Sequence, residues 1–203
     1  MDQKNELQPT ATPEKEPAKS SVLDIVEMFV FAAVAVMLLL TFGFRICEVD
    51  GPSMNTTLAD GERLIVSDLF YTPKQGDVIV FHQTGESYNK PIVKRVIATG
   101  GQHVKIDYRQ NKVYVSDDTD FTEDEVIDES TYALFEGYNG TWREARYDDS
   151  DVFSVPDGHL FVMGDNRNNS ADSRVAEIGF VDARRVLGKV LVRLTPFSKF
   201  GKI

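Results

Sequence analysis

An uncharged apolar run near the N-terminus constrains this chain more than any other feature. The 17 residues from Met28 to Phe44 carry no charge, and the apolar stretch extends back to Val22. A helix over 22–44 would be about 34 Å long, enough to cross a hydrocarbon core of about 30 Å. Because the run is apolar on all sides, it does not fit a core helix with one solvated face. We therefore predict a transmembrane anchor at 22–44.

A cleaved signal peptide is the main alternative to a retained anchor. Such a peptide has basic residues before its apolar run and small residues at its end. Here Asp24 and Glu27 open the run, and it closes on Gly-Phe-Arg-Ile-Cys at 43–47. These residues favour an uncleaved anchor.

The anchor divides the chain into three parts. Residues 1–21 are polar, contain three prolines and lack an apolar period, which predicts a disordered tail. Three lysines precede the anchor, whereas only Arg45 and Arg63 follow closely. By the positive-inside rule we expect a single-pass protein of the cell membrane, with a cytoplasmic tail and residues 45–203 outside the cytoplasm.

Residues 45–203 are predicted to form a mainly β domain. Short runs rich in Val, Ile and Phe alternate with Gly and Pro, and no long helical period is present. A polar stretch between two of the runs predicts a hairpin over 104–115. The expected strands are 62–69, 76–81, 92–98, 104–107, 112–115, 159–163 and 186–194.

The chain is acidic, with 22 Lys and Arg against 32 Asp and Glu and a net charge of −10. Segment 117–151 holds 13 acidic and two basic residues, so it contributes −11 and the rest of the chain +1. Its acids lack the spacing of a calcium loop, and we expect a solvated excursion. Net acidity argues against a nucleic-acid partner. One Cys and three His without metal-ligand spacing predict no metal site.

Ser53 is the serine with the most distinctive neighbours. It lies in the sequence DGPSM, nine residues after the anchor, where Gly51 and Pro52 favour a tight, fixed turn. Such a turn can present a hydroxyl and its own N–H to a substrate carbonyl. The five residues by themselves fit an ordinary turn serine better.

A nucleophilic serine needs a base, and Lys94 is the best candidate. It lies in the apolar run 91–97, and strand alternation places it on one face with Ile92 and Val96. Burial there would favour the neutral amine, which can accept a proton. An exposed lysine on an edge strand fits the pattern equally well. No histidine has a comparable context; the three are His82, His103 and His159.

A polar loop, GDNRNNSADSR at 164–174, follows the expected strand 159–163. It is dense in side chains that hydrogen-bond their own backbone, as in a rigid loop. Behind an active site it could orient a lysine and brace itself with Asp–Arg pairs. On the surface it would be an ordinary polar turn.

Taken together, these stretches resemble the bacterial type I signal peptidases, or leader peptidases, which are membrane-bound Ser/Lys endopeptidases. Residues 51–58 (GPSMNTTL) resemble the nucleophile box G-x-S-M-x-P-T-L of that family, and 94–101 (KRVIATGG) resemble its lysine box. Residues 76–81 (GDVIVF) resemble one of its strands. Residues 164–174 match G-D-N-R-x-N-S-x-D-S-R at every fixed position.

The match has departures near the reacting groups. Thr56 and Gly100 stand where the family has proline, and Gln102 replaces an acid. Gly51 stands where some members have a Ser or Thr that helps to bind the oxyanion. These differences leave efficiency and substrate range open.

The resemblance implies a mechanism without metal or organic cofactor. Neutral Lys94 takes the proton of Ser53, which attacks the scissile carbonyl, and the Ser53 N–H binds the oxyanion. Ser170 would orient Lys94 by a hydrogen bond. The implied substrates are secretory preproteins with small residues at the first and third positions before the cut, met at the lipid bilayer. The residues implied to brace the polar loop are Asp172, Arg174, Asp165 and Arg95.

Three other functions are alternatives to signal-peptide cleavage. A mitochondrial inner-membrane peptidase shares the boxes, but we see no Arg-rich, acid-poor transit segment before the anchor. A repressor-type Ser/Lys autopeptidase would carry a DNA-binding domain and no anchor. A non-catalytic, membrane-anchored assembly factor of the same fold would not need both Ser53 and Lys94.

Overall fold

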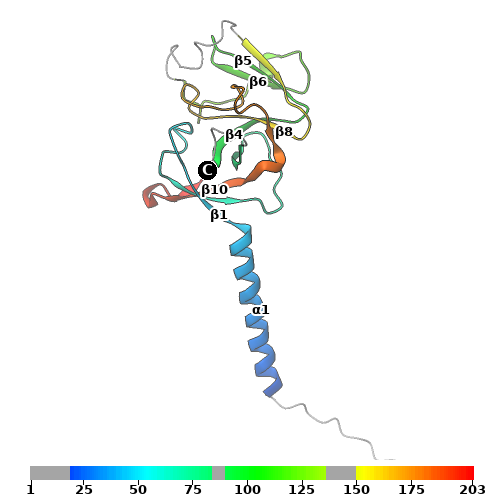
Figure 1. The fold of residues 1–203 in the computed structure, drawn as a ribbon, viewed down its shortest axis with the longest axis vertical. Helices are drawn as coiled ribbons and strands as arrows, with labels where there is room; N and C mark the ends of the chain where they lie inside the picture. The colour runs from blue at the N-terminus through cyan, green and yellow to red at the C-terminus, as the bar shows by residue number, and fades with distance from the viewer. Residues whose placement is uncertain (1–18, 84–89, 136–149) are drawn as a thin grey trace, which may run out of the picture. The chain divides into compact units, whose positions relative to one another are not determined.

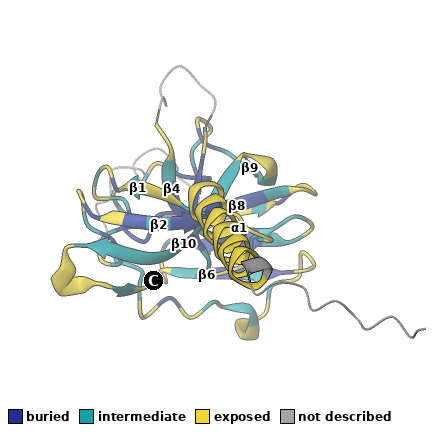
Figure 2. Cartoon of the chain, turned by 90° about the horizontal axis from the view of Figure 1, so that it is seen from below, coloured by how far each residue is buried: buried dark blue, intermediate teal, exposed yellow. Residues whose placement is uncertain are grey.

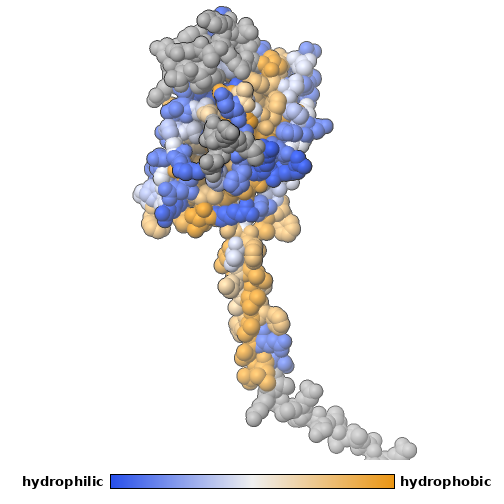
Figure 3. Space-filling model, in the orientation of Figure 1, coloured by the Kyte–Doolittle hydropathy of each residue, from blue (hydrophilic) through white to orange (hydrophobic). Residues whose placement is uncertain are grey.

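The described part of the N-terminal unit is one long apolar helix. The structure, a computed structural model, describes residues 19–83, 90–135 and 150–203, and the chain divides into units at 1–41 and 42–203. Helix α1 (Lys19–Gly43) contains a 23-residue apolar stretch, Ser21–Gly43, in which the mean hydropathy of an 18-residue window reaches 2.6. Its side chains from 21 to 42 are exposed and almost all apolar (Figures 2 and 3). The helix is therefore long and apolar enough to cross a membrane.

Helix α1 begins at Lys19, whereas the sequence predicted a tail over 1–21 and an anchor from residue 22. Residues 19–21, assigned to a disordered tail by sequence, belong to α1. The remainder of the predicted tail, residues 1–18, lies outside the described residues.

The second unit is built on a large antiparallel sheet (Figure 1). Among the described residues, eight strands form it in the order β1-β2-β10-β3-β4-β8-β9, with β11 also paired to β10. The long strand β10, from the C-terminal part of the chain, thus lies between β2 and β3, which come from the first half of the chain. The strands are β1 (Arg45–Glu48), β2 (Arg63–Ser67), β3 (Val78–Phe81), β4 (Ile92–Thr99), β8 (His159–Met163), β9 (Val181–Asp182), β10 (Val186–Thr195) and β11 (Gly201–Lys202).

A smaller three-stranded sheet has the order β6-β5-β7. It contains β5 (His103–Asp107), β6 (Lys112–Ser116) and β7 (Ser150–Ser154), and β5 and β6 form the hairpin expected from the sequence. The short 3₁₀ turns are η1 (Glu123–Glu125), η2 (Ala183–Arg185) and η3 (Phe197–Lys199).

The predicted mainly β fold after one N-terminal helix is confirmed. Every expected strand is present within a few residues of its predicted bounds. Four further strands were not predicted, and each is short or flanked by polar residues: β1, β7, β9 and β11.

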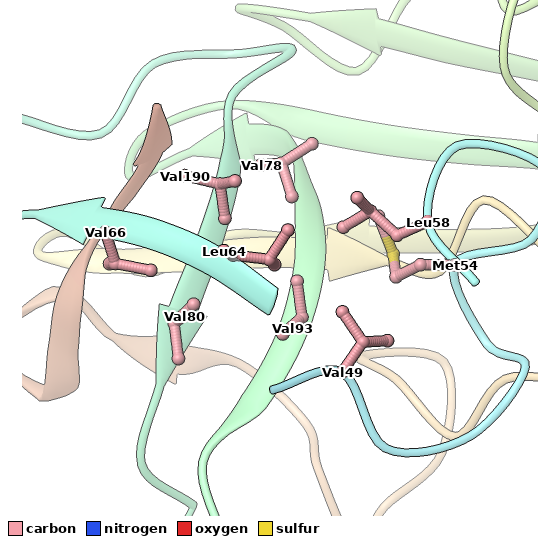
Figure 4. Packing of buried hydrophobic residues seen from close by; sticks show 9 residues of the cluster. All are labelled: Val49, Met54, Leu58, Leu64, Val66, Val78, Val80, Val93 and Val190. Carbon is pink, nitrogen blue, oxygen red and sulfur yellow. The ribbon is translucent and has the colours of Figure 1, made fainter. Parts of the chain in front are cut away.

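The serine segment, residues 51–58, packs against the sheet through buried side chains. Met54 and Leu58, on either side of the turn that follows Ser53, are fully buried. Figure 4 shows them beside Val49 and Val93 in one apolar cluster with residues of β2, β3 and β10. Burying a Met or Leu side chain stabilises a fold by about 1.5–3 kcal/mol. The apolar residues of the GPSMNTTL stretch therefore hold Ser53 at the face of the sheet.

Strand β4 carries Lys94 through the interior of the domain. It pairs with β3 on one side and with β8 on the other, so the interpretation of Lys94 as an exposed edge-strand residue is wrong. Val96 packs with residues of β3 and β8, and Ile97 packs with residues of the smaller sheet. Lys94 is only 3% exposed.

Candidate active site

Ser53 and Lys94 lie in hydrogen-bonding contact although they are 41 positions apart in sequence. The distance from Lys94 Nζ to Ser53 Oγ is 2.7 Å. A neutral amine in this position accepts the hydroxyl proton directly, which is the geometry that a serine nucleophile and its base require.

The surroundings of Lys94 favour its neutral form. Burial lowers the pKa of Lys94 from its ordinary value to about 8. The carboxylate of Asp172 acts in the opposite direction, Arg174 adds to the lowering, and Asp165 opposes it. Because burial has the largest effect, the amine loses its proton at a pH far below that of an exposed lysine.

Backbone contacts fix the turn that presents Ser53. Gly51 has a φ of +90°, in the left-handed region that favours glycine, and its N–H donates to Asp60 Oδ1 at 2.7 Å. The Ser53 carbonyl accepts from the backbone N–H of Asn166 at 3.0 Å, and Asn166 Nδ2 donates to the Pro52 carbonyl at 3.2 Å. The polar loop thus grips the backbone on both sides of the nucleophile.

Asp172 accepts several hydrogen bonds from other residues of the polar loop. Its fully buried carboxylate accepts from Arg174 Nε at 2.6 Å and Nη2 at 2.7 Å, and from the Gly164 N–H at 2.9 Å. Burial alone would raise the pKa of Asp172, but the Arg174 guanidinium and these hydrogen bonds outweigh it and lower that pKa. Asp172 is therefore ionised and braces the loop.

Ser170 contacts Asp172 and not Lys94. Its hydroxyl donates to Asp172 Oδ2 at 2.7 Å, and no hydrogen bond between Ser170 and Lys94 occurs in the part of the chain that the structure describes. The expected hydrogen bond from Ser170 to the lysine is thus not found. The single hydroxyl proton of Ser170 goes to the Asp172 carboxylate, a charged and stronger acceptor two residues away, and is not available to the Lys94 amine.

Asp165 pairs with Arg95, a pairing that the sequence did not specify. Arg95 Nε and Nη2 donate to the two carboxylate oxygens at 2.8 and 2.7 Å, and Nη1 donates to the Gly76 carbonyl at 2.8 Å. Thr57 Oγ1 donates to Asp165 Oδ2 at 2.5 Å. One carboxylate therefore joins the serine segment, strand β4 and the polar loop.

Sequence reasoning missed a further buried ion pair, beyond those of Asp172 and Asp165. Arg167 donates to both carboxylate oxygens of Glu129, at 2.6 and 2.5 Å, and the two residues are 1% and 7% exposed. Glu129 lies in segment 117–151, so the expectation of a solvated excursion is wrong at this residue. A buried guanidinium requires a counter-charge, and Glu129 supplies it. Residues 136–149 of the segment lie outside the described residues.

The signals for the missed residues differ. Asn166, Arg167 and Thr57 occupy fixed positions of the motifs that the sequence matches, so those motifs could have pointed to them. Glu129 stands among many acids, and nothing in the sequence distinguishes it from its neighbours.

A cleft of about 480 Å³ opens at Ser53 and Lys94. Val49, Ile92 and other small or apolar side chains line it. Asp50 and Lys90 also line it and form an ion pair at 2.6 Å. Its size and lining suit a short extended peptide with small apolar side chains. Among the residues that the structure describes, no group of three or more His, Cys, Asp or Glu side chains is arranged to hold a metal ion.

Comparisons with known proteins point to one family. The family model for signal peptidase, peptidase S26, matches residues 22–195. A probable signal peptidase I-1 of Synechocystis is 34% identical over 182 residues, covering 84% of this chain and 82% of the relative. The signal peptidase I of Bacillus amyloliquefaciens is 33% identical, covering 93% and 96% of the two chains. A crystal structure of a signal peptidase I from Enterococcus faecalis aligns with a TM-score of 0.39 and 24% identity, covering 59% of this chain and 97% of that one.

Proposed function

The chain belongs to the signal peptidase family, peptidase S26, and is a membrane-anchored serine peptidase that removes signal peptides; from this membership we propose that Ser53 and Lys94 are its catalytic dyad. The observation that carries the proposal is the 2.7 Å hydrogen bond between the two side chains, with the amine buried and its pKa lowered.

In the acylation step, neutral Lys94 accepts the hydroxyl proton of Ser53, and Oγ forms a bond to the scissile carbonyl carbon. The carbonyl electron pair moves onto oxygen, where the Ser53 N–H stabilises the negative charge. As the tetrahedral intermediate collapses, the Lys94 ammonium gives its proton to the leaving amine and an ester remains on Ser53.

Deacylation repeats these steps with water. Lys94 removes a proton from a water molecule, the oxygen attacks the ester carbonyl, and the ammonium returns the proton to Ser53 Oγ as the acid product leaves. Lys94 is thus the base and the acid of both halves of the reaction.

We assign positioning roles to the residues around the dyad. Asp165 and Arg95 hold the polar loop against β4, and Asp172 with Arg174 and Ser170 keeps the loop in shape. These residues act on the reaction by fixing the backbone around Ser53.

The proposed substrates are secretory preproteins with small residues at the first and third positions before the cut. In an extended peptide these two side chains point to the same side, toward the apolar lining of the cleft. The proposed topology has the tail in the cytoplasm and residues 45–203 outside it, at the membrane face where signal peptides emerge. Anchoring both enzyme and substrate in one bilayer raises their effective concentration.

The dyad is tested with full-length protein in lipid vesicles and a preprotein that carries an Ala-x-Ala site. Ser53→Ala and Lys94→Ala should each lower kcat by about a thousandfold or more while the fold survives. Ser154→Ala and Lys112→Ala, which change an exposed serine and a lysine outside the cleft, are matched controls. Full cleavage by folded Lys94→Ala would refute the dyad, and no cleavage by the wild type would favour the non-catalytic assembly factor.

A further inference from the structure

The segment from Glu129 to Leu134 contacts the polar loop through a buried bidentate ion pair. The planar Arg167 guanidinium meets the Glu129 carboxylate at two points, so both side chains are fixed in distance and in orientation. Arg167 Nε also donates to the Gly164 carbonyl at 3.0 Å. The ion pair therefore extends to the residue at which the loop leaves strand β8.

The same segment also grips the loop by its backbone. The Leu134 N–H donates to the Asp165 carbonyl at 2.8 Å, and the Arg167 N–H donates to the Leu134 carbonyl at 3.1 Å. Asn166 lies between these two bonded residues, and it is the residue whose N–H holds the Ser53 carbonyl. A shift of Leu134 is thus transmitted to the nucleophile through a single intervening residue.

Tyr132 links the segment to the strand that carries Lys94. The guanidinium of Arg95 lies 4.0 Å from the centroid of the Tyr132 ring, within the range of a cation–π contact. The Tyr132 hydroxyl donates to Glu129 Oε1 at 3.2 Å. The segment thus contacts both neighbours of the catalytic pair, the loop behind Ser53 and the arginine next to Lys94.

Stability alone does not account for this ion pair. Replacing a buried pair by apolar side chains of similar volume is often neutral or stabilising, because desolvating two charges offsets their attraction. A bidentate pair specifies one geometry, however, which apolar contacts do not.

We propose that segment 129–134 is a positioning element of the active site and that Glu129 is a positioning residue, acting through Arg167 on the placement of Ser53 and Lys94. The inference rests on the proposed dyad. It assigns a role in the established reaction to a stretch of the chain that shares no residue with the serine, lysine or polar-loop motifs.

The test compares Glu129→Gln with Glu123→Gln in the full-length protein. Glu123 is the matched control, because it is an exposed acid of segment 117–151 that lies outside 129–134, and its hydrogen bonds among the described residues go to Lys112 and Tyr114 of strand β6. With the Ala-x-Ala preprotein, Glu129→Gln should lower kcat by about tenfold or more and leave KM nearly unchanged, as expected for a misplaced reacting group. Glu123→Gln should match the wild type in both constants.

The pH dependence of kcat separates positioning from a general loss of folded protein. A loosened loop admits water to Lys94, and burial is the main cause of the lowered pKa of Lys94. The charged groups that face Lys94 from the loop are Asp172, Arg174 and Asp165. The rise of activity with pH should therefore move to higher pH in Glu129→Gln, and raising the pH should restore part of the rate. A smaller fraction of folded enzyme lowers the whole profile without moving it.

A double variant tests whether Glu129 acts through Arg167. If it does, Glu129→Gln combined with Arg167→Met is no slower than Arg167→Met alone. Glu129→Asp keeps the charge but withdraws the carboxylate by one methylene, so it provides a folded variant with a smaller loss of kcat. Wild-type kcat and pH profile in folded Glu129→Gln, or losses that multiply in the double variant, would overturn the proposal. Activity in Ser53→Ala would instead refute the dyad, whatever Glu129 does.

Discussion

Substituting Gly164 by alanine tests how closely the polar loop sets the position of the nucleophile. A Cβ added at Gly164 would overlap Ser170 Oγ and lie 2.5 Å from the Ser53 carbonyl oxygen. Ordinary contact begins at 3.4 Å, so the Ser53 carbonyl must move by about 0.9 Å unless the loop retreats by the same amount. Either movement stretches the hydrogen bond from Asn166 that fixes the Ser53 backbone.

The expected cost is larger in rate than in stability. Misplacing a reacting group by about 1 Å lowers a rate by about a hundredfold, whereas an added methyl group in a packed site costs about 1–3 kcal/mol of unfolding free energy. We therefore expect Gly164→Ala to be folded and to have a kcat about a hundred times lower than the wild type.

The assay measures kcat and KM for the preprotein together with the unfolding free energy in urea. Gly201→Ala is the matched control, because Gly201 has no heavy atom near its added Cβ and needs no left-handed backbone. A folded Gly164→Ala enzyme with wild-type kcat would show that the polar loop does not set the position of Ser53.

Two further outcomes are expected. Cleavage should rise with pH through about 8, because Lys94 is protonated below its pKa and cannot accept the Ser53 proton; a kcat that stays at its plateau well below that pH contradicts Lys94 as the base. Thr57→Val removes the hydroxyl that donates to Asp165 and should lower the unfolding free energy by about 1 kcal/mol; an unchanged urea midpoint would show that this hydrogen bond adds nothing to stability.

Local patterns predicted the helix and the main strands well. The apolar run of α1 and the Val- and Ile-rich runs of β3 and β10 owe their structure to their own residues, so their bounds could be read from the sequence. Strand β1 could not, because Arg45–Glu48 alternates weakly and becomes a strand through its pairing with β2. Strand β9 has two residues and likewise depends on its partner, β8.

The environment of Lys94 required information from distant residues. Alternation suggested an apolar face, but β4 is a central strand only because His159–Met163, more than 60 positions later, pairs with it. The partners of Asp165 and Ser170 depended on which of several nearby polar groups came closest, which residue spacing does not determine. The burial of Glu129 could not be predicted for the same reason, because it depends on the position of its distant partner Arg167.

The strand order also means that the large sheet cannot be completed until the C-terminal part of the chain has been synthesised. β10 lies between β2, which follows the serine segment, and β3, which precedes the lysine strand. Until residues 186–195 are available, β2 and β3 share no neighbour in the sheet, and the serine and lysine halves are not joined through it. Such long-range pairing forms late in folding. A chain synthesised only as far as β8 therefore carries both reacting side chains but lacks the strand that joins β2 to β3 in the sheet.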